Sequence, residues 1–269
     1  MGRRRPLPLC CPDPVVALPQ GYSLRAFAEI DSTNEEARRL GDAGVPGPIW
    51  ITAERQTAGR GRRGREWVSP SGNFMGTLFL RPQVGPRKAA ELSFVAALAV
   101  HDAVDALLPP PLRPGLKLKW PNDLLHDGRK LAGILLESSG IAGSELAWLA
   151  IGIGINLARY PDNVEYPATS LAALGLADVT PERALEFLAA AFDRRLRQWN
   201  EVQGFAAIRE AWLARAAGLG GPVTVRLVDE TFEGVFVGLA PDGALDVRLP
   251  SGEIRKIAAG DVFFRTASH

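Results

Sequence analysis

The hydrophobic positions of the chain fall into short apolar runs separated by polar turns. Residues 48–54 and 73–81 are rich in β-branched and aromatic side chains, which predicts two strands. Three further apolar runs predict strands at 116–120, 131–138 and 146–157. The sequence DGRK at 127–130 predicts a hairpin turn just before the second of these three strands.

Helical spacing of apolar residues marks other segments. Residues 89–108 predict a helix that stops at three consecutive prolines. The sequence DSTNEEARRL at 31–40 predicts a helix start, with Ser32 and Glu35 spaced as a capping box. Two more helices are expected, from Thr180-Pro181 to about Trp199 and from about Val202 to Ala217. This order of strands and helices predicts an α+β fold in which helices back a mixed sheet.

The composition changes at Gly220-Gly221-Pro222. Short alternating segments follow at 223–228, 231–240, 244–250, 253–258 and 262–265. Pro-Asp-Gly and Pro-Ser-Gly turns separate them, so they predict a small β-barrel. We therefore expect a proline-rich arm at 1–21, a larger domain at 22–219 and a small barrel domain at 220–269.

Composition narrows the function classes. The 269 residues are 46% hydrophobic and carry a formal net charge of +1, so no overall charge attracts DNA or an anionic membrane. Cys10 and Cys11 are neighbours and predict no structural disulfide framework. Prolines break the apolar run of the arm, and no segment reaches the roughly 18 apolar residues of a membrane span. We expect a cytoplasmic protein.

The positive charge is instead local. Residues 55–67, RQTAGRGRRGREW, hold five arginines and three glycines in thirteen positions. Glycines let backbone N–H groups approach phosphate oxygens, and arginines bind phosphate or carboxylate in bidentate fashion. No Walker A motif occurs in the chain. The stretch indicates an anion site, and a solvated basic loop is the alternative.

Two motifs follow in the predicted sheet. In LKLKWPNDLL at 116–125, Pro121 should end a strand and present Asn122 and Asp123 at its end. Asp123 could hold Mg²⁺ beside a phosphate site, whereas Pro-Asn-Asp is also an ordinary turn. In GRKLAGILLES at 128–138, Lys130 enters a strand that should be buried. A lysine there either extends outward to water or bridges two anions in a pocket.

A last motif, GIGINL at 152–157, alternates glycine with isoleucine and reaches Asn156, a pattern typical of close approach by a ligand or by another backbone. Several motifs are absent. The three histidines are far apart and lack metal-ligand spacing. No nucleophile elbow is present, and neither cysteine has a convincing base nearby. The sequence thus offers no protein nucleophile.

The order and spacing of these motifs are more specific than any one of them. The series DSTN (31–34), QTAGRGRRGREW (56–67), KWPND (119–123), RKLAGIL (129–135) and GIGIN (152–156) resembles the catalytic domain of biotin protein ligases. The resemblance runs from about residue 22 to the C-terminus. It implies a class II synthetase-like catalytic domain at 22–219 with a mixed sheet, followed by an SH3-like domain at 220–269.

The resemblance also implies a reaction in two steps. The carboxylate of biotin attacks the α-phosphorus of MgATP and forms biotinyl-5′-AMP and pyrophosphate. A lysine ε-amine of a biotin carboxyl carrier protein then attacks this mixed anhydride. Because the carboxylate and the triphosphate repel each other, the enzyme must supply preorganised cations and N–H donors rather than a nucleophile.

The resemblance assigns roles to the matching residues. Those facing biotin would be Ser32, Thr33, Asn34, Gln56, Gly133 and the backbone of Gly59 and Arg60. Arg62 and Lys130 would reach both the biotin carboxylate and the α-phosphate, with Lys130 as the main catalytic cation. Trp67 would stack on adenine.

The nucleotide side would include Arg60, Arg62, Arg65, Asn122, Lys130, Asn156 and Arg265. Asp123 would either bind Mg²⁺ or orient the acceptor lysine, and both roles stay open. Residues 157–171 would form a second loop that closes on the adenylate.

The resemblance also bears on partners. About twenty residues precede the catalytic domain, too few for the DNA-binding domain of some family members, so we expect a ligase without specific DNA binding or a repressor role. A homodimer is possible. The rivals are a lipoate–protein ligase, a basic nucleic-acid-binding module around Arg60–Arg65, and an inactive scaffold. Lys130, Arg62 and Asp123 argue against the last of these.

Overall fold

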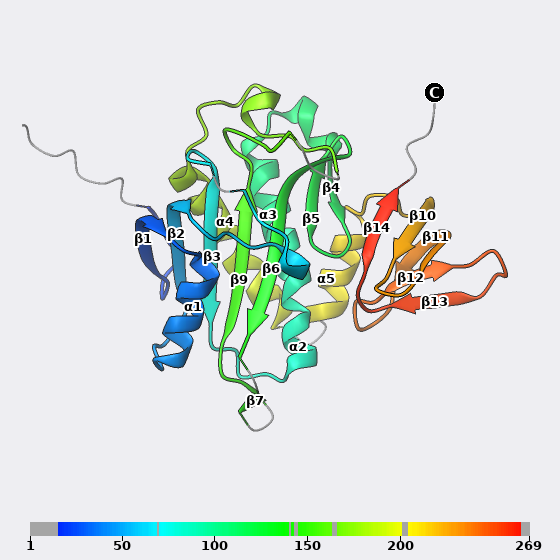
Figure 1. The fold of residues 1–269 in the computed structure, drawn as a ribbon, viewed down its shortest axis with the longest axis horizontal. Helices are drawn as coiled ribbons and strands as arrows, with labels where there is room; N and C mark the ends of the chain where they lie inside the picture. Colours follow the sequence, from blue (N-terminus) through cyan, green and yellow to red (C-terminus); the bar gives the residue numbers. More distant parts are fainter. Residues whose placement is uncertain are drawn as a thin grey trace, which may run out of the picture.

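A computed structural model describes residues 16–68, 70–139, 141–142, 145–162, 166–200 and 204–264, without the side chains of 141 and 142. The larger domain contains a seven-stranded sheet in the order β1-β2-β3-β9-β6-β5-β4 (Figure 1). Its strands are β1 (Ser23–Ile30), β2 (Ile49–Gln56), β3 (Phe74–Leu80), β4 (Leu116–Lys119), β5 (Asp123–His126), β6 (Arg129–Ser138) and β9 (Leu149–Ile155). β1 and β2 are parallel, and the other neighbours are antiparallel.

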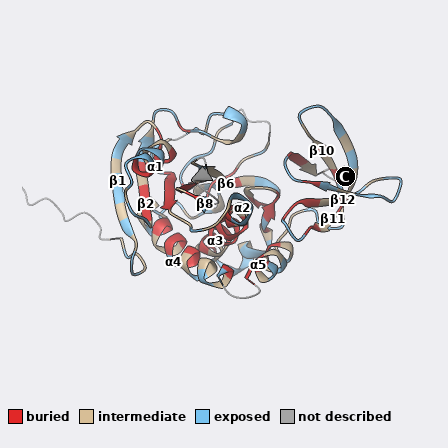
Figure 2. Ribbon diagram, turned by 90° about the horizontal axis from the view of Figure 1, so that it is seen from below, coloured by how far each residue is buried: buried red, intermediate tan, exposed pale blue. Residues whose placement is uncertain are grey.

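Successive residues of a strand point to opposite sides of the sheet, and helices cover both of these faces. The helices are α1 (Thr33–Asp42), α2 (Pro86–Ala90), α3 (Leu92–Leu107), α4 (Pro181–Trp199) and α5 (Gly204–Leu213). On one face, α1 packs Ala37 and Leu40 against Ile49, Ile51 and Phe79. On the other, α3, α4 and α5 pack together (Figure 2).

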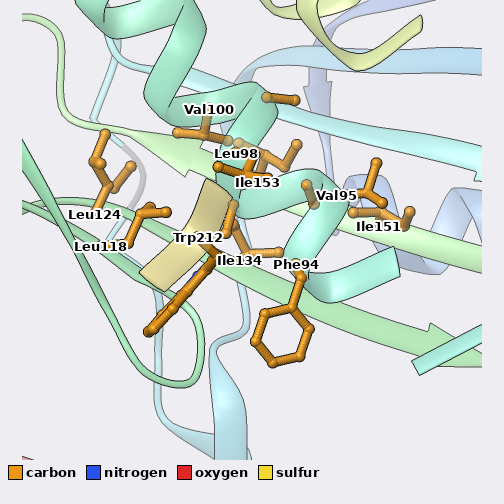
Figure 3. Close-up of a cluster of buried hydrophobic side chains, with 14 of the residues drawn as sticks. Phe94, Val95, Leu98, Val100, Leu118, Leu124, Ile134, Ile151, Ile153 and Trp212 are labelled. Carbon is orange, nitrogen blue, oxygen red and sulfur yellow. The ribbon is translucent and has the colours of Figure 1, made fainter. Parts of the chain in front are cut away.

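The larger core lies under α3. This helix buries apolar side chains almost all around its circumference, including Phe94, Val95 and Leu98. They meet the inward residues of the sheet and of α5, such as Ile134, Ile151 and Trp212 (Figure 3). Such a core fixes the sheet rigidly, so the strand ends that carry the predicted motifs have a firm support.

A five-stranded antiparallel sheet forms the C-terminal domain, consistent with the expected SH3-like domain. Its strands are β10 (Pro222–Arg226), β11 (Thr231–Leu239), β12 (Leu245–Arg248), β13 (Ile254–Ile257) and β14 (Asp261–Phe264). Figure 1 shows this sheet beside the β4 edge of the larger one. Trp120 Nε1 donates to Gly243 O at 3.3 Å across the junction.

The fold class is confirmed, and several details differ from the sequence expectation. Strands β1 and β5 of the seven-stranded sheet are additional to those that the sequence predicts, and the helix expected to reach Ala217 ends at Leu213. The expected helix at 89–108 is divided at Glu91 into α2 and α3. Ser32 does occupy the N-cap of α1, but its side chain makes no capping bond, and Glu35 pairs with Arg38 instead. By contrast, Thr180 Oγ1 caps α4 by accepting from Arg183 N at 3.2 Å.

The remaining elements are small. β7 (Ile141–Ala142) and β8 (Glu145–Leu146) form a separate hairpin between β6 and β9. Short 3₁₀ turns occur at Arg62–Gly64, Pro110–Gly115 and Ala172–Leu174. Within the described part of the chain, every helix is too short or too polar to cross a bilayer.

Candidate active site

A cavity of about 240 Å³ opens on the sheet face that α1 covers, between the two domains. Residues from the N-terminus of α1, the Arg-Gly stretch, β3, β6, β9 and β14 line it. The predicted site residues among them are Ser32, Thr33, Asn34, Gln56, Arg60, Arg62, Arg65, Trp67, Asn122, Asp123, Lys130, Gly133 and Asn156. Gly59 is buried outside the lining, and Arg265 lies outside the described residues.

One end of the cavity is a polar pocket at the start of α1. Gln56 Oε1 accepts from Thr33 N at 2.8 Å and from Thr33 Oγ1 at 3.1 Å, so this bond pattern orients the Gln56 amide. The Ser32 hydroxyl is buried in the cavity wall and makes no bond to the helix end. A polar ligand there could bond to the Ser32 hydroxyl, because this hydroxyl does not cap α1.

Asn34 is held from both sides. Its Nδ2 donates to Glu137 Oε2 at 2.7 Å, and its Oδ1 accepts from Thr77 Oγ1 at 2.6 Å. A Cβ at Gly152 would collide with the Asn34 amide, so glycine on β9 gives this side chain its space. The amide therefore presents a fixed donor and acceptor pattern to the pocket, as specific recognition of a small polar group requires.

Carboxylates hold most of the arginines of the Arg-Gly stretch. Arg60 Nη2 lies 3.2 Å from Glu35 Oε2 and 3.4 Å from Glu137 Oε2. Asp261 Oδ2 in β14 accepts from Arg65 Nη2 at 2.8 Å and from Arg63 Nη1 at 3.0 Å. The stretch therefore lies folded beside the cavity, and its exposed arginines are paired with carboxylates of other elements.

Arg62 differs from its neighbours in the stretch. Its Nη1 donates to the neutral Asn122 Oδ1 at 3.1 Å, and it makes no ion pair with any described residue. Partial burial lowers the pKa of its guanidinium, and the charges of Asp261 and Asp123 offset this effect only in part. A partly buried cation without a carboxylate partner favours the arrival of an anion, because the anion would offset the cost of its desolvation.

Lys130 points into the cavity. Its Nζ lies 2.7 Å from Asp123 Oδ1 and 5.6 Å from the centroid of the Trp67 ring. Asp123 Oδ1 is buried and has no partner with hydrogen-bond geometry, so the contact with Lys130 is an ion pair without good alignment. Asn122 stands beside this pair and donates Nδ2 to Ile134 O at 2.7 Å.

Trp67 lies on a glycine platform. Gly133 of β6 and Gly154 of β9 are paired across the two strands. A Cβ at Gly133 would come within 2.9 Å of the Trp67 ring, and one at Gly154 would collide with it. The two glycines thus let the aromatic ring lie close to the sheet at the wall of the cavity.

Asn156 ties β9 to the second predicted loop. It is buried, and its Nδ2 donates to Thr169 O at 3.0 Å. Around it, Lys130 N donates to Pro167 O at 2.7 Å and Thr169 N donates to Lys130 O at 2.9 Å. The backbone on both sides of Lys130 is therefore clamped by this loop, of which 163–165 lie outside the described residues.

Sequence reasoning assigns no role to three charged residues of the cavity wall, Glu66, Lys119 and Asp261. Lys119 is buried, and its Nζ lies 3.8 Å from the centroid of the Tyr166 ring. In LKLK the two lysines alternate with leucine as in an ordinary half-exposed strand, so the pattern gives no signal. Asp261 follows Gly260 as a turn residue would, and only the fold places it against Arg63, 198 positions earlier.

No cluster of three or more His, Cys, Asp or Glu suited to a metal ion occurs among the described residues. Asp123 is the carboxylate that lies beside Lys130. Mg²⁺ commonly takes one or two protein carboxylates and completes its shell with substrate phosphates and water. Asp123 would be the residue to hold such an ion if it arrives with a nucleotide.

The arrangement as a whole joins a polar pocket, partly buried cations and an aromatic ring in one cavity. Such a site can hold two anionic groups side by side and stabilise negative charge that develops between them. The class of protein that uses this chemistry includes ligases that activate a carboxylate with a nucleotide.

Comparison with known proteins agrees with this class. Residues 26–156 match the Biotin/lipoate A/B protein ligase family, and residues 218–265 match the Biotin protein ligase C terminal domain. A biotin–[acetyl-CoA-carboxylase] ligase of Paracoccus denitrificans is 51% identical over 88% of this chain and 99% of its own length. One of Mycobacterium tuberculosis is 33% identical over 93% and 92%.

A solved structure supports the same relationship. The biotin protein ligase of Aquifex aeolicus in complex with biotin and ATP superimposes with a TM-score of 0.75. It is 28% identical and covers 91% of this chain and 99% of its own. The chain belongs to the biotin protein ligase family, and the expected resemblance is confirmed.

Proposed function

We propose that the protein activates biotin with MgATP to biotinyl-5′-AMP and transfers the biotinyl group to a lysine of a carboxyl carrier protein. The observation that carries this proposal is Arg62, a partly buried cation whose partner in the cavity is a neutral amide. Family membership supports the choice of biotin over lipoate, since the matched C-terminal domain and the similar relatives are those of biotin ligases.

In the first step, the polar pocket would bind the ureido ring of biotin through Ser32, Thr33, Asn34 and Gln56. The biotin carboxylate would then point toward Arg62 and Lys130, while the α-phosphate of ATP approaches from the Trp67 side. Lys130 would exchange its ion pair with Asp123 for contacts to the two reacting anions. Its charge would then stabilise the charge that grows on the α-phosphate oxygens. Asp123 would be the residue that holds Mg²⁺, which would supply positive charge to the phosphates when bound with ATP.

In the second step, the amine of the acceptor lysine attacks the carbonyl carbon of the adenylate and AMP leaves. The proton of the amine needs an acceptor, and Asp123 is a carboxylate already inside the cavity. The Arg-Gly stretch would exclude water, which otherwise hydrolyses the anhydride. Arg60, Arg65, Asn156 and Arg265 would contact the nucleotide.

One experiment tests the proposal directly. The protein is incubated with MgATP, biotin and an apo carrier domain, and intact mass is measured. We expect one biotinyl group on one lysine of the acceptor. No mass gain with biotin, together with ATP–pyrophosphate exchange that depends on lipoate, would favour the rival ligase. The expected lack of specific DNA binding and the possible homodimer stay predictions, which a gel shift and sedimentation analysis test.

A further inference from the structure

Strand β14 presents two side chains to the larger domain. Asp261, which lines the cavity, and Phe263 are two positions apart in the strand and point to the same side, whereas Val262 between them is buried. Each of the two side chains contacts a different loop of the larger domain. We refer to residues 57–68 as the first loop and to residues 166–171 as the second loop.

Asp261 holds the first loop. Its Oδ2 lies 2.8 Å from Arg65 Nη2 and 3.0 Å from Arg63 Nη1. Burial alone would raise the pKa of this carboxyl, but the charges of Arg65 and Arg63 outweigh it and hold the pKa below its usual value. The carboxylate is therefore ionised at neutral pH, and it neutralises arginines that sit beside Arg62.

Phe263 holds the second loop. Its ring centroid lies 5.1 Å from that of Tyr166, with the planes tilted by 30°. Lys119 Nζ lies beside both rings, 3.8 Å from the Tyr166 centroid and 5.8 Å from that of Phe263. The ring pair thus fixes Tyr166 at the cavity, close to the segment that clamps Lys130.

Arg226 of β10 connects the two contacts. Its Nη2 lies 3.5 Å from Asp261 Oδ2, and its guanidinium carbon lies 4.6 Å from the centroid of the Phe263 ring. The strand pairing explains this position, since Arg226 lies opposite Asp261. An unbroken series of contacts therefore runs from the first loop, across β14 and β10, to the second loop.

We infer that β14 is a strut that positions the two loops together, so that Asp261 and Phe263 couple the position of the first loop to that of the second. The two loops then cover the cavity as one unit, because moving the strut away from either loop displaces the contact with the other. The small domain acts in this way as a positioning element for the site, and Asp261 and Phe263 are positioning residues.

Hydrogen exchange of backbone amides tests the coupling without substrate. Gly61 N and Trp67 N report on the first loop, since they donate to Arg65 O at 2.7 Å and to Gly59 O at 3.0 Å. Thr169 N reports on the second loop through its bond to Lys130 O. Rates are divided by those of amides in β9, the central strand, so that a general loss of stability cancels.

Asp261→Asn removes the charge that binds the first loop and leaves Phe263 in place. We expect exchange at Gly61 and Trp67 to rise about tenfold, and exchange at Thr169 to rise about threefold although the substituted side chain does not touch the second loop. Phe263→Leu should give the reverse pattern, with the larger rise at Thr169. Asp261→Glu keeps the carboxylate and should restore most of the protection in both loops.

Asp102→Asn is the matched control. Asp102 of α3 is also a largely enclosed carboxylate among arginines, with Arg195 Nε at 2.8 Å and Arg194 Nη2 at 3.3 Å, but it does not line the cavity. We expect no change in the normalised exchange of either loop. If each β14 variant affects its own loop alone, or if neither loop responds, the coupling does not exist.

An activity measurement adds a second readout, and this part alone rests on the proposed function. Asp261→Asn should raise KM for ATP about fivefold and release free biotinyl-5′-AMP, while transfer from added adenylate keeps its kcat. If the expected exchange pattern is observed but the protein activates no acid, the coupling through β14 stands and the proposed function is wrong. Unchanged KM and adenylate retention in both variants would show that β14 has a structural role only.

Discussion

At the residue scale, two cations of the cavity are held in place before any substrate binds. Lys130 Nζ is 2.7 Å from Asp123, and the backbone on both sides of Lys130 is bonded to the second loop. Arg62 is partly buried beside a neutral amide. Both cations are therefore positioned in the cavity in advance, although Lys130 must release Asp123 before it contacts a ligand, and charges positioned in advance stabilise charge that develops at phosphorus.

Lys130→Ala should lower the rate of biotin-dependent ATP–pyrophosphate exchange by about 100-fold, the usual size of the loss of one preorganised electrostatic contact. The KM for biotin should change less than kcat, because the charge contributes most at the transition state. Lys117→Ala is the control, since Lys117 is exposed on β4. An exchange rate near normal in Lys130→Ala would remove this residue from the catalytic group.

Asp102 gives a residue-scale prediction about pH. Burial would raise its pKa, but His101, Arg195 and nearby arginine charges outweigh burial and hold the pKa well below the usual value. A depressed pKa contributes stability that is present above the unfolded-state pKa of about 3.9 and is lost as pH falls toward the folded value. The free energy of unfolding in urea should therefore drop less between pH 5 and pH 3 in Asp102→Asn than in the parent protein. Equal slopes would contradict the assignment.

At the scale of elements, the glycine platform of β6 and β9 lets Trp67 of the first loop lie against the sheet. Gly154→Ala places a methyl group in the position of the Trp67 ring, so the ring must move away from the sheet. We expect weaker ATP binding, by about tenfold, and more free adenylate than in the parent protein. Gly238→Ala is the control, because a Cβ there has open space. Adding Trp67→Leu to Gly154→Ala should cost less than the sum of the two changes.

The same scale shows what the sequence could predict. Strands such as β2, β3 and β9 have strongly apolar runs, and α4 has a hydroxyl cap, so each is recognisable locally. β1 escapes prediction because its residues 23–30 are mostly exposed at the sheet edge, and its large apolar residues Leu24, Phe27 and Ile30 are three positions apart instead of alternating as in a typical strand. β5 escapes prediction because Pro121 marks the end of a strand in the sequence, whereas the chain turns there and re-enters the sheet at Asp123.

The sequence predicts those site residues that belong to a local motif, and it does not predict those that only the tertiary fold brings to the cavity. Thirteen of the predicted residues line one cavity because each belongs to a local motif at a strand end, a helix start or the Arg-Gly stretch. Glu137, Lys119 and Asp261 have no pattern of their own that points to the cavity. The contacts of Glu137 and Asp261 with arginines of the Arg-Gly stretch join positions 77 to 198 apart, and such pairings depend on the tertiary fold. The same fold explains why these arginines face carboxylates before any ligand is present.

At the scale of the whole molecule, the junction between the domains makes each depend on the other. We expect that cutting the chain at the proposed boundary, residue 220, lowers stability and leaves the site incomplete. Trp120 bonds to Gly243, a residue of the small domain that lies close to Phe94 and Phe205. A protein ending at residue 219 would expose this apolar surface and lose Asp261 from the cavity wall. We expect a lower free energy of unfolding and ATP binding weakened by at least about tenfold.

Two measurements on the shortened protein separate these effects. Urea denaturation followed by tryptophan fluorescence reports the loss of the apolar junction. Calorimetric titration with a nonhydrolysable nucleotide reports the loss of Asp261 from the cavity wall. The full-length Asp261→Asn protein is the control, because it keeps the junction intact. It should share the weaker nucleotide binding while it retains most of the stability. If the shortened protein binds nucleotide as tightly as the full chain, the small domain does not belong to the site.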